Sequence, residues 1–211
     1  RTGSYSCEMY NASNDTDKYA QRNFRLPAVY KEVYFYFYVY LPDGTEGNGG
    51  VAFNHADRAG STNNKLFRLW ANNGINEGNN GYGSFGKIGA CTWSDGNGNG
   101  DLRLDWTPNT SAKPTTGDHG ATSCGFFSIA DRGTWVKVGV YAKAAQSAVE
   151  KTHIIVYKND VEVLNEYADN YKDSEVAGYQ WGYLLGTPNA GYPDGDTIMQ
   201  IDDVYFAGVL L

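Results

Sequence analysis

Residues 31–42 alternate tyrosines with fully apolar residues, which is the period of a β-strand and not that of a helix. The tyrosines occupy every second position and are Tyr34, Tyr36, Tyr38 and Tyr40. Because successive side chains of a strand point to opposite faces, the apolar parity predicts a core face. The tyrosine parity, with apolar rings and polar tips, predicts a face that is wet but able to bind.

Short alternating segments, bounded by Gly, Asn, Asp and Ser, recur along the rest of the chain. They predict strands within residues 3–10, 49–55, 64–71, 100–106, 133–143, 153–167, 179–186 and 197–208. The segment 153–167 predicts two strands around a turn at residues 158–160, and only residues 144–151 have a helical pattern. With no internal repeat and no break in composition, residues 1–211 are expected to form a single all-β domain of two packed antiparallel sheets.

Composition agrees with this fold class and excludes some functions. The chain has 211 residues, of which 26 are glycine, and 15% are aromatic. A net charge of -7 argues against a nucleic-acid partner. The sequence contains no apolar run of about 18 residues, which a membrane-spanning helix would need. Of the three cysteines, Cys91 and Cys124 either pair or remain thiols like Cys7. Because the chain begins at Arg1, it is expected to be a piece of a larger protein or assembly.

Several of these segments resemble the concanavalin A-like lectin/glucanase superfamily. Others are similar to jelly-roll carbohydrate-binding modules and jelly-roll polysaccharide lyases. The segments that carry the resemblance are "GTWVKVGVYAK", "IIVYKNDVEVLNEY" and "QIDDVYFAG" for the superfamily, "RTGSYSCEMY" for the modules, and "EVYFYFYVYLP" with "KLFRLW" for the lyases. The resemblance implies a two-sheet antiparallel jelly-roll sandwich of the concanavalin A-like type. It is specific for a fold and leaves function to be argued from a site.

Aromatic rings on alternating strands are the main functional signal. Such rings stack on the apolar C–H faces of sugars, while nearby polar groups fix the hydroxyls. The predicted carbohydrate-binding residues are Tyr34, Tyr36, Tyr38, Tyr40, Arg68, Trp70, Trp135 and Tyr141. We therefore predict a non-catalytic domain that recognises a polysaccharide or other glycan in an extracellular, secreted or surface-displayed setting. The alternative is that another layer or a partner chain covers the tyrosines as ordinary packing.

Two other functions stay open. A polysaccharide lyase that acts by β-elimination on a uronate polymer would take His55 or Tyr141 as base and Arg68 or Lys137 to neutralise the uronate carboxylate. A structural or decoration protein, for instance on a virus particle, would use the sandwich to contact other subunits of an assembly. A retaining glucanase is disfavoured, because the chain lacks the Glu-x-Asp-x-x-Glu type of motif.

One glycine-rich segment resembles half of a calcium loop. Its candidate ligands, Asp95, Asn97, Asn99 and Asp101, alternate in the D-x-N-x-N-G pattern, with Asp105 as a further acid. The position where an EF-hand has its glutamate is Trp106, so an EF-hand is excluded. The pattern predicts a structural calcium ion or, alternatively, a turn that uses Asn and Asp for its geometry.

The resemblance to jelly-roll modules implies a second calcium candidate at Asp202 and Asp203, of which only one carboxylate can point to a given face.

Overall fold

The computed structural model describes residues 7–11, 21–40, 63–71, 88–94, 100–106, 123–147, 149–168, 178–186 and 197–210. These residues form strands and one short 3-10 helix, and none of their helices is long and apolar enough to cross a membrane. The elements are β1 (Cys7–Asn11), β2 (Gln21–Tyr40), β3 (Asn63–Ala71), β4 (Ile88–Ser94), β5 (Gly100–Trp106), β6 (Ser123–Phe127), η1 (Ile129–Asp131), β7 (Trp135–Lys143), β8 (Thr152–Lys158), β9 (Val161–Ala168), β10 (Tyr179–Gly186) and β11 (Thr197–Leu210).

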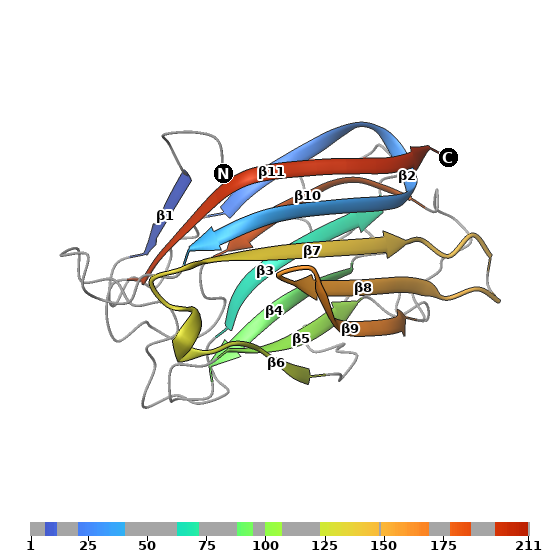
Figure 1. The fold of residues 1–211 in the computed structure, drawn as a ribbon. Coiled ribbons are helices and arrows are strands. Elements are labelled where there is room, and N and C mark those ends of the chain that lie inside the picture. The colour runs from blue at the N-terminus through green and yellow to red at the C-terminus, as the bar shows by residue number, and fades with distance from the viewer. Residues whose placement is uncertain are drawn as a thin grey trace.

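All strand pairs are antiparallel, and the strands lie in two layers that share β2 (Figure 1). In sheet I the order is β6-β5-β4-β3-β10, followed by the first half of β2. In sheet II the order is β1-β11, then the second half of β2, then β7-β8-β9. The layers face each other, because the Phe35 ring of sheet II lies 5.6 Å from the Phe67 ring of sheet I. The predicted all-β antiparallel sandwich is therefore confirmed.

Strand β2 passes from one sheet to the other at Pro27. In the pairing of β2 with β10, Tyr30 is the partner of Tyr179 and Arg25 is the partner of Trp181. β2 therefore has extra residues between these two pairs. Pro27 lies within this irregular stretch and is exposed. Since proline has no N–H to give to a ladder, it is tolerated at such an irregularity on a sheet edge.

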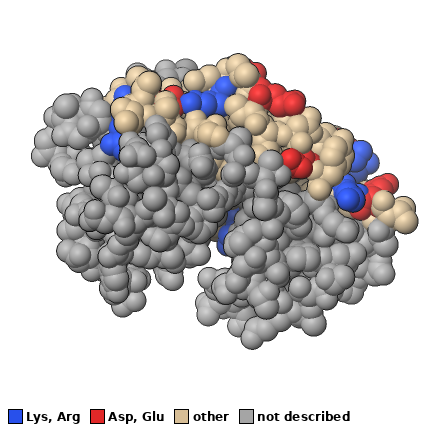
Figure 2. Space-filling view, turned by 90° about the horizontal axis from the view of Figure 1, so that it is seen from below, with Lys and Arg blue, Asp and Glu red and all other residues tan. Residues whose placement is uncertain are grey.

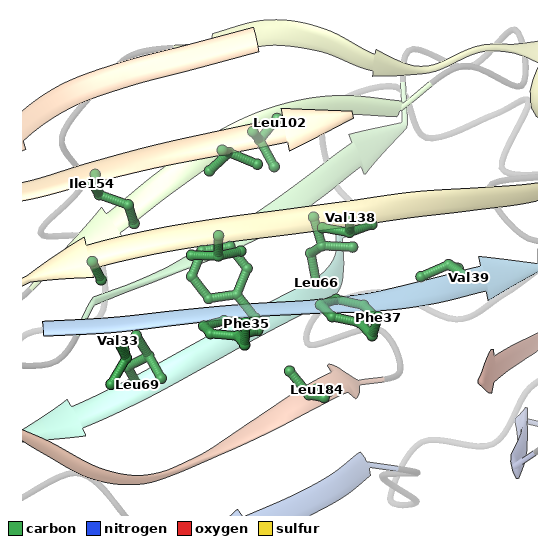
Figure 3. Close-up of a cluster of buried hydrophobic side chains, with 14 of the residues drawn as sticks. Val33, Phe35, Phe37, Val39, Leu66, Leu69, Leu102, Val138, Ile154 and Leu184 are labelled. Atoms are coloured by element: carbon green, nitrogen blue, oxygen red, sulfur yellow. The ribbon is translucent and has the colours of Figure 1, made fainter. Parts of the chain in front are cut away.

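The apolar residues that alternate with the tyrosines in residues 33–39 form the centre of the core (Figure 3). Its members are at most 1% exposed and are Val33, Phe35, Phe37 and Val39. Leu66, Leu69 and Leu184 approach from sheet I and are at most 2% exposed. Full burial of one such side chain stabilises the fold by about 1.5–3 kcal/mol. The alternation that the sequence predicted for this strand is confirmed, because the tyrosines between these residues are only half-buried.

One smaller prediction turns out differently, and the backbone bears on the pairing of Cys91 with Cys124, which the sequence left open. Residues 144–151 contain no helix in their described part, where they connect β7 to β8. Cys91 lies on β4 and Cys124 on β6, with β5 between them. Two strand spacings amount to about 10 Å, beyond the roughly 7 Å between Cα atoms that a disulfide tolerates. The backbone therefore argues against pairing, and Cys7 is an exposed free thiol.

Candidate functional site

The predicted glycan-binding residues divide between the two outer faces of the sandwich. Phe67 and Leu69 are buried, so Arg68 between them points away from the core on sheet I. The half-buried residues on the outer face of sheet II are Tyr34, Tyr36, Tyr38, Tyr40, Trp135 and Tyr141. Trp70 pairs with Trp181 in the backbone register of sheet I, and its side chain lies outside the described part. One continuous site containing all eight residues is therefore not formed.

The outer face of sheet II gains a further ring from β11. A β-bulge lies between Asp202, which faces Tyr38, and Tyr205, which faces Tyr36. The bulge residue Asp203 has φ 46°, and its N–H donates to Asp202 Oδ1 over 2.8 Å. Because the bulge shifts the alternation by one residue, Tyr205 points outward. Phe206 instead packs on the core, with its ring 5.1 Å from that of Phe35.

Tyr36 is covered on both sides of its ring. Tyr205 stacks on it at 5.2 Å with an interplanar angle of 19°, and Lys137 Nζ lies 4.6 Å from the ring centre. These two contacts come from opposite directions, since β11 and β7 flank β2. The ring that remains 48% exposed is that of Tyr205. Tyr205 was not among the predicted residues, although the "QIDDVYFAG" segment contains it.

Lys137 is held by the hairpin between β8 and β9. Its ammonium donates to Asp160 Oδ1 over 2.6 Å, and this hydrogen bond raises the pKa of Lys137 above its usual 10.5. The Lys137 backbone N–H donates to Asn159 Oδ1 over 2.9 Å. Asn159 and Asp160 both have positive φ, as a two-residue type I′ turn requires. The turn predicted at residues 158–160 is confirmed, and it keeps Lys137 in place beside Tyr36.

Tyr141 is a hydrogen-bond donor in its present environment. Its hydroxyl donates to Glu32 Oε2 over 3.3 Å, and Glu32 also pairs with Lys143. Burial, and then the negative charge of Glu32, raise the pKa of Tyr141 above 10.0. A phenol that holds its proton more strongly is a weaker candidate for a base near neutral pH. On the same face, the His153 ring stacks on Tyr167 at 4.3 Å.

The described residues predicted for a lyase divide between the two outer faces. Lys137 and Tyr141 lie on the outer face of sheet II, Arg68 lies on the outer face of sheet I, and His55 is outside the described residues. A combination of Arg68 with Tyr141 is therefore excluded by the sandwich itself, whose two sheets are about 10 Å apart. Any chemistry at Arg68 needs partners on its own face.

The outer face of sheet I joins Arg68 to a tyrosine that sequence reasoning missed. Arg68 faces Tyr183 in the register of β3 and β10, and its guanidinium carbon lies 5.5 Å from the centre of the Tyr183 ring. Tyr183 is only 2% exposed, whereas Arg68 is half-buried. Asn23 and Arg25 on the adjacent half of β2 are exposed on this face. In Figure 2 a few basic atoms are visible between undescribed residues, and the broad described band beside them carries both signs of charge.

The calcium prediction falls largely outside the described part of the chain. Asp95, Asn97 and Asn99 are not described, and Asp101 is described only as a backbone position in β5. Within the described ranges, no group of three or more His, Cys, Asp or Glu side chains forms a metal site. Asp202 caps the bulge at Asp203 instead. Calcium therefore stays a prediction.

No protein-family model and no curated protein matches the sequence. Solved structures do match. A doubly substituted variant of alginate lyase Aly36B, in which a lysine and a tyrosine are replaced by alanine, in complex with alginate tetrasaccharide, matches with TM-score 0.64, 14% identity and coverage of 98% of this chain and 82% of that chain.

Two further solved structures have the same architecture. The endo-β-1,4-glucuronan lyase of the fungus Trichoderma reesei matches with TM-score 0.56, 13% identity and coverage of 99% and 83%. The carbohydrate recognition domain of Emp47p matches with TM-score 0.52, 10% identity and coverage of 96% and 89%. At these identities the likeness establishes the fold alone: the chain is a two-sheet antiparallel jelly-roll sandwich.

Proposed function

We propose that this domain recognises an acidic polysaccharide along the outer face of sheet I, with Arg68 as the residue that binds a uronate carboxylate. The observation that carries the proposal is the position of Arg68, which points away from the core and rests against the ring of Tyr183. A guanidinium fork matches a carboxylate in geometry, and the ring beneath it limits its motion. Arg68 is thus a preorganised cation on an otherwise acidic protein.

Neighbouring residues extend the surface beyond a single contact. Arg25 and Asn23 are exposed on β2, and β10 lies between them and Arg68 on β3. Two strand spacings and an offset of two residues along the strands separate the arginines by roughly 12 Å. Two cations at this separation suit a linear polymer that carries repeated carboxylates better than a single small anion. Asn23, beside Tyr183 in the register, offers a donor and an acceptor for sugar hydroxyls.

The structural neighbours support the same ligand class. The Aly36B variant was captured with alginate tetrasaccharide, and the Trichoderma reesei protein is a glucuronan lyase. The Emp47p domain is a carbohydrate recognition domain. Proteins of this fold thus include glycan binders as well as lyases, so the fold alone does not decide between them. A domain of this kind would meet its polysaccharide in an extracellular or surface-displayed location.

A lyase is the second candidate, and the contact between Arg68 and Tyr183 is what favours it. In β-elimination a base removes the proton beside the uronate carboxylate, its electron pair forms the carbon–carbon double bond, and the glycosidic oxygen leaves with a proton. Arg68 would neutralise the carboxylate and Tyr183 would transfer a proton. Because Tyr183 is nearly buried, it would have to become accessible when the substrate binds.

Affinity electrophoresis in gels containing alginate or glucuronan tests the proposal. We expect the polymer to retard the wild-type protein, and Arg68→Ala to weaken binding about ten- to a hundredfold, the usual loss for a hydrogen bond to a charged group. Arg68→Lys keeps the positive charge but loses the planar guanidinium group, so its affinity should lie between those of the wild type and Arg68→Ala. Lys143→Ala, which removes a cation from the opposite face, is the matched control.

Two results separate the candidates. A rise in ultraviolet absorbance from unsaturated uronate products, abolished by Tyr183→Phe in a folded protein, would favour the lyase over the binding domain. Retardation that is unchanged in both folded Arg68 variants, or absent for every uronate polymer, would refute the proposal.

A further inference from the structure

The bulge in β11 puts a residue with positive φ next to an exposed ring. Asp203 adopts φ 46°, a conformation that aspartate tolerates better than most residues, and Asp202 Oδ1 fixes it by accepting the Asp203 N–H. Without the extra residue the alternation would turn Tyr205 toward the core and Phe206 toward solvent. The bulge thus presents Tyr205 on the outer face of sheet II.

Tyr205 is also held rigidly. It stacks on Tyr36, and Tyr36 rests on the Lys137 ammonium, which is fixed by Asp160 over 2.6 Å. Nearly half of the Tyr205 side chain remains exposed. A flat ring that is rigid before binding loses little entropy when a ligand stacks on it. The stack of Lys137, Tyr36 and Tyr205 is therefore a preformed platform.

The charges around the platform indicate what it can bind. Lys137 is paired with Asp160, and Lys143 is paired with Glu32. Asp202 faces the same row as Lys137, across Tyr38. The described cations of this part of the face are thus neutralised, and a polyanion gains nothing from them. Rings with hydroxyl tips between paired charges suit an uncharged sugar, whose C–H face stacks and whose hydroxyls form hydrogen bonds.

We propose that the outer face of sheet II carries a second glycan-binding site, specific for uncharged polysaccharide, in which Tyr205 is the stacking residue and Tyr36, Tyr38 and Lys137 support it. This site lies on the opposite side of the sandwich from Arg68, so it goes beyond the proposed function and does not rest on it. It also assigns a role to the tyrosine-rich half of β2.

Affinity electrophoresis in gels containing glucomannan or mixed-linkage β-glucan, with alginate gels run in parallel, tests this site. We expect neutral glycan to retard the wild-type protein. Tyr205→Ala should weaken the retardation about tenfold, and Tyr205→Phe, which keeps the ring, should preserve most of it. The matched control is Tyr167→Ala, which removes another exposed ring of sheet II three strands away from β2 on β9. Binding to alginate should not change in Tyr205→Ala.

Three outcomes would overturn the inference. The first is that no neutral glycan retards the wild-type protein, even if alginate does. The second is that Tyr205→Ala binds neutral glycan as well as Tyr167→Ala. The third is a wild-type protein that sediments as a dimer and a Tyr205→Ala variant that sediments as a monomer, which would assign the platform to a second copy of the chain. Loss of alginate binding alone would count against the proposed function and leave this site standing.

Discussion

Replacing Gly182 with alanine should destabilise the fold strongly, because no space exists for a methyl group there. Gly182 lies in β10, where a Cβ atom would clash with the Arg68 carbonyl oxygen and lie 2.8 Å from Phe24 Cζ. The Phe24 ring can turn aside, but a carbonyl oxygen moves only with its strand. The substitution therefore forces β10 away from β3 next to the contact between Arg68 and Tyr183.

The size of the effect follows from what must give way. Overpacking a well-filled site costs about 1–3 kcal/mol. Stretching the ladder between β10 and β3 weakens backbone hydrogen bonds that contribute about 1 kcal/mol each. We therefore expect Gly182→Ala to lower the free energy of unfolding by about 3 kcal/mol or more. Gly125→Ala in β6 is the matched control, since nothing lies within 4 Å of a Cβ at Gly125, and it should change stability by about 0.5 kcal/mol or less.

Urea unfolding followed by tryptophan fluorescence measures both variants. With a slope of about 2 kcal/mol per molar urea, a loss of 3 kcal/mol lowers the midpoint by about 1.5 M. Gly125→Ala should unfold close to the wild-type midpoint. Equal midpoints for Gly182→Ala and Gly125→Ala would refute the close approach of β10 to β3, and with it the geometry assigned to Arg68.

Three other outcomes follow from the described contacts. Burial raises the pKa of Asp131, but hydrogen bonds from Lys158 and Ser128 lower it by more, below 3.8. Stability should therefore fall as pH falls below that value, and Asp131→Asn should be about 1–3 kcal/mol less stable at pH 7 and flatten this dependence in urea titrations. Burial raises the pKa of Tyr179 above its usual 10.0, so the protein should lose stability as pH rises above that value. The tyrosinate absorbance of Tyr179 should appear only when the protein unfolds, and it should be missing in Tyr179→Phe. Phe37→Ala should cost about 3–5 kcal/mol by calorimetry, because the Phe37 side chain has no exposed surface.

The sequence predicted the strands in which apolar and polar or aromatic side chains alternate. Residues 33–40 were assigned to the correct faces because a strand has a fixed period of two. The strands at 100–106 and 179–186 were predicted with the bounds that the structure has. The β8–β9 turn was predictable as well, because Asn159 and Asp160 are residue types that tolerate positive φ.

Other elements lacked such a local signal. β4 was not predicted, because its "IGACTWS" sequence is poor in large alternating side chains, and β6 is a run of only five residues. The first half of β2 was missed as well, since Pro27 argues against a regular strand. Tyr183 and Tyr205 were not recognised because their roles depend on strands that are distant in sequence. Register and bulges decide such roles, and a single sequence does not contain them.

The division of the aromatic residues between two faces changes how the sequence motif is interpreted. β2 contributes Arg25 to the outer face of sheet I and, after the bend at Pro27, Tyr36 to the outer face of sheet II. The core between these faces is about 10 Å thick and filled by Phe35 and Phe37, so one sugar chain cannot contact both surfaces at the same point. One strand therefore supports two surfaces of different charge, one with basic side chains and one with paired charges and rings. Substitutions on the two faces are then expected to act independently, as sites separated by a packed core usually do.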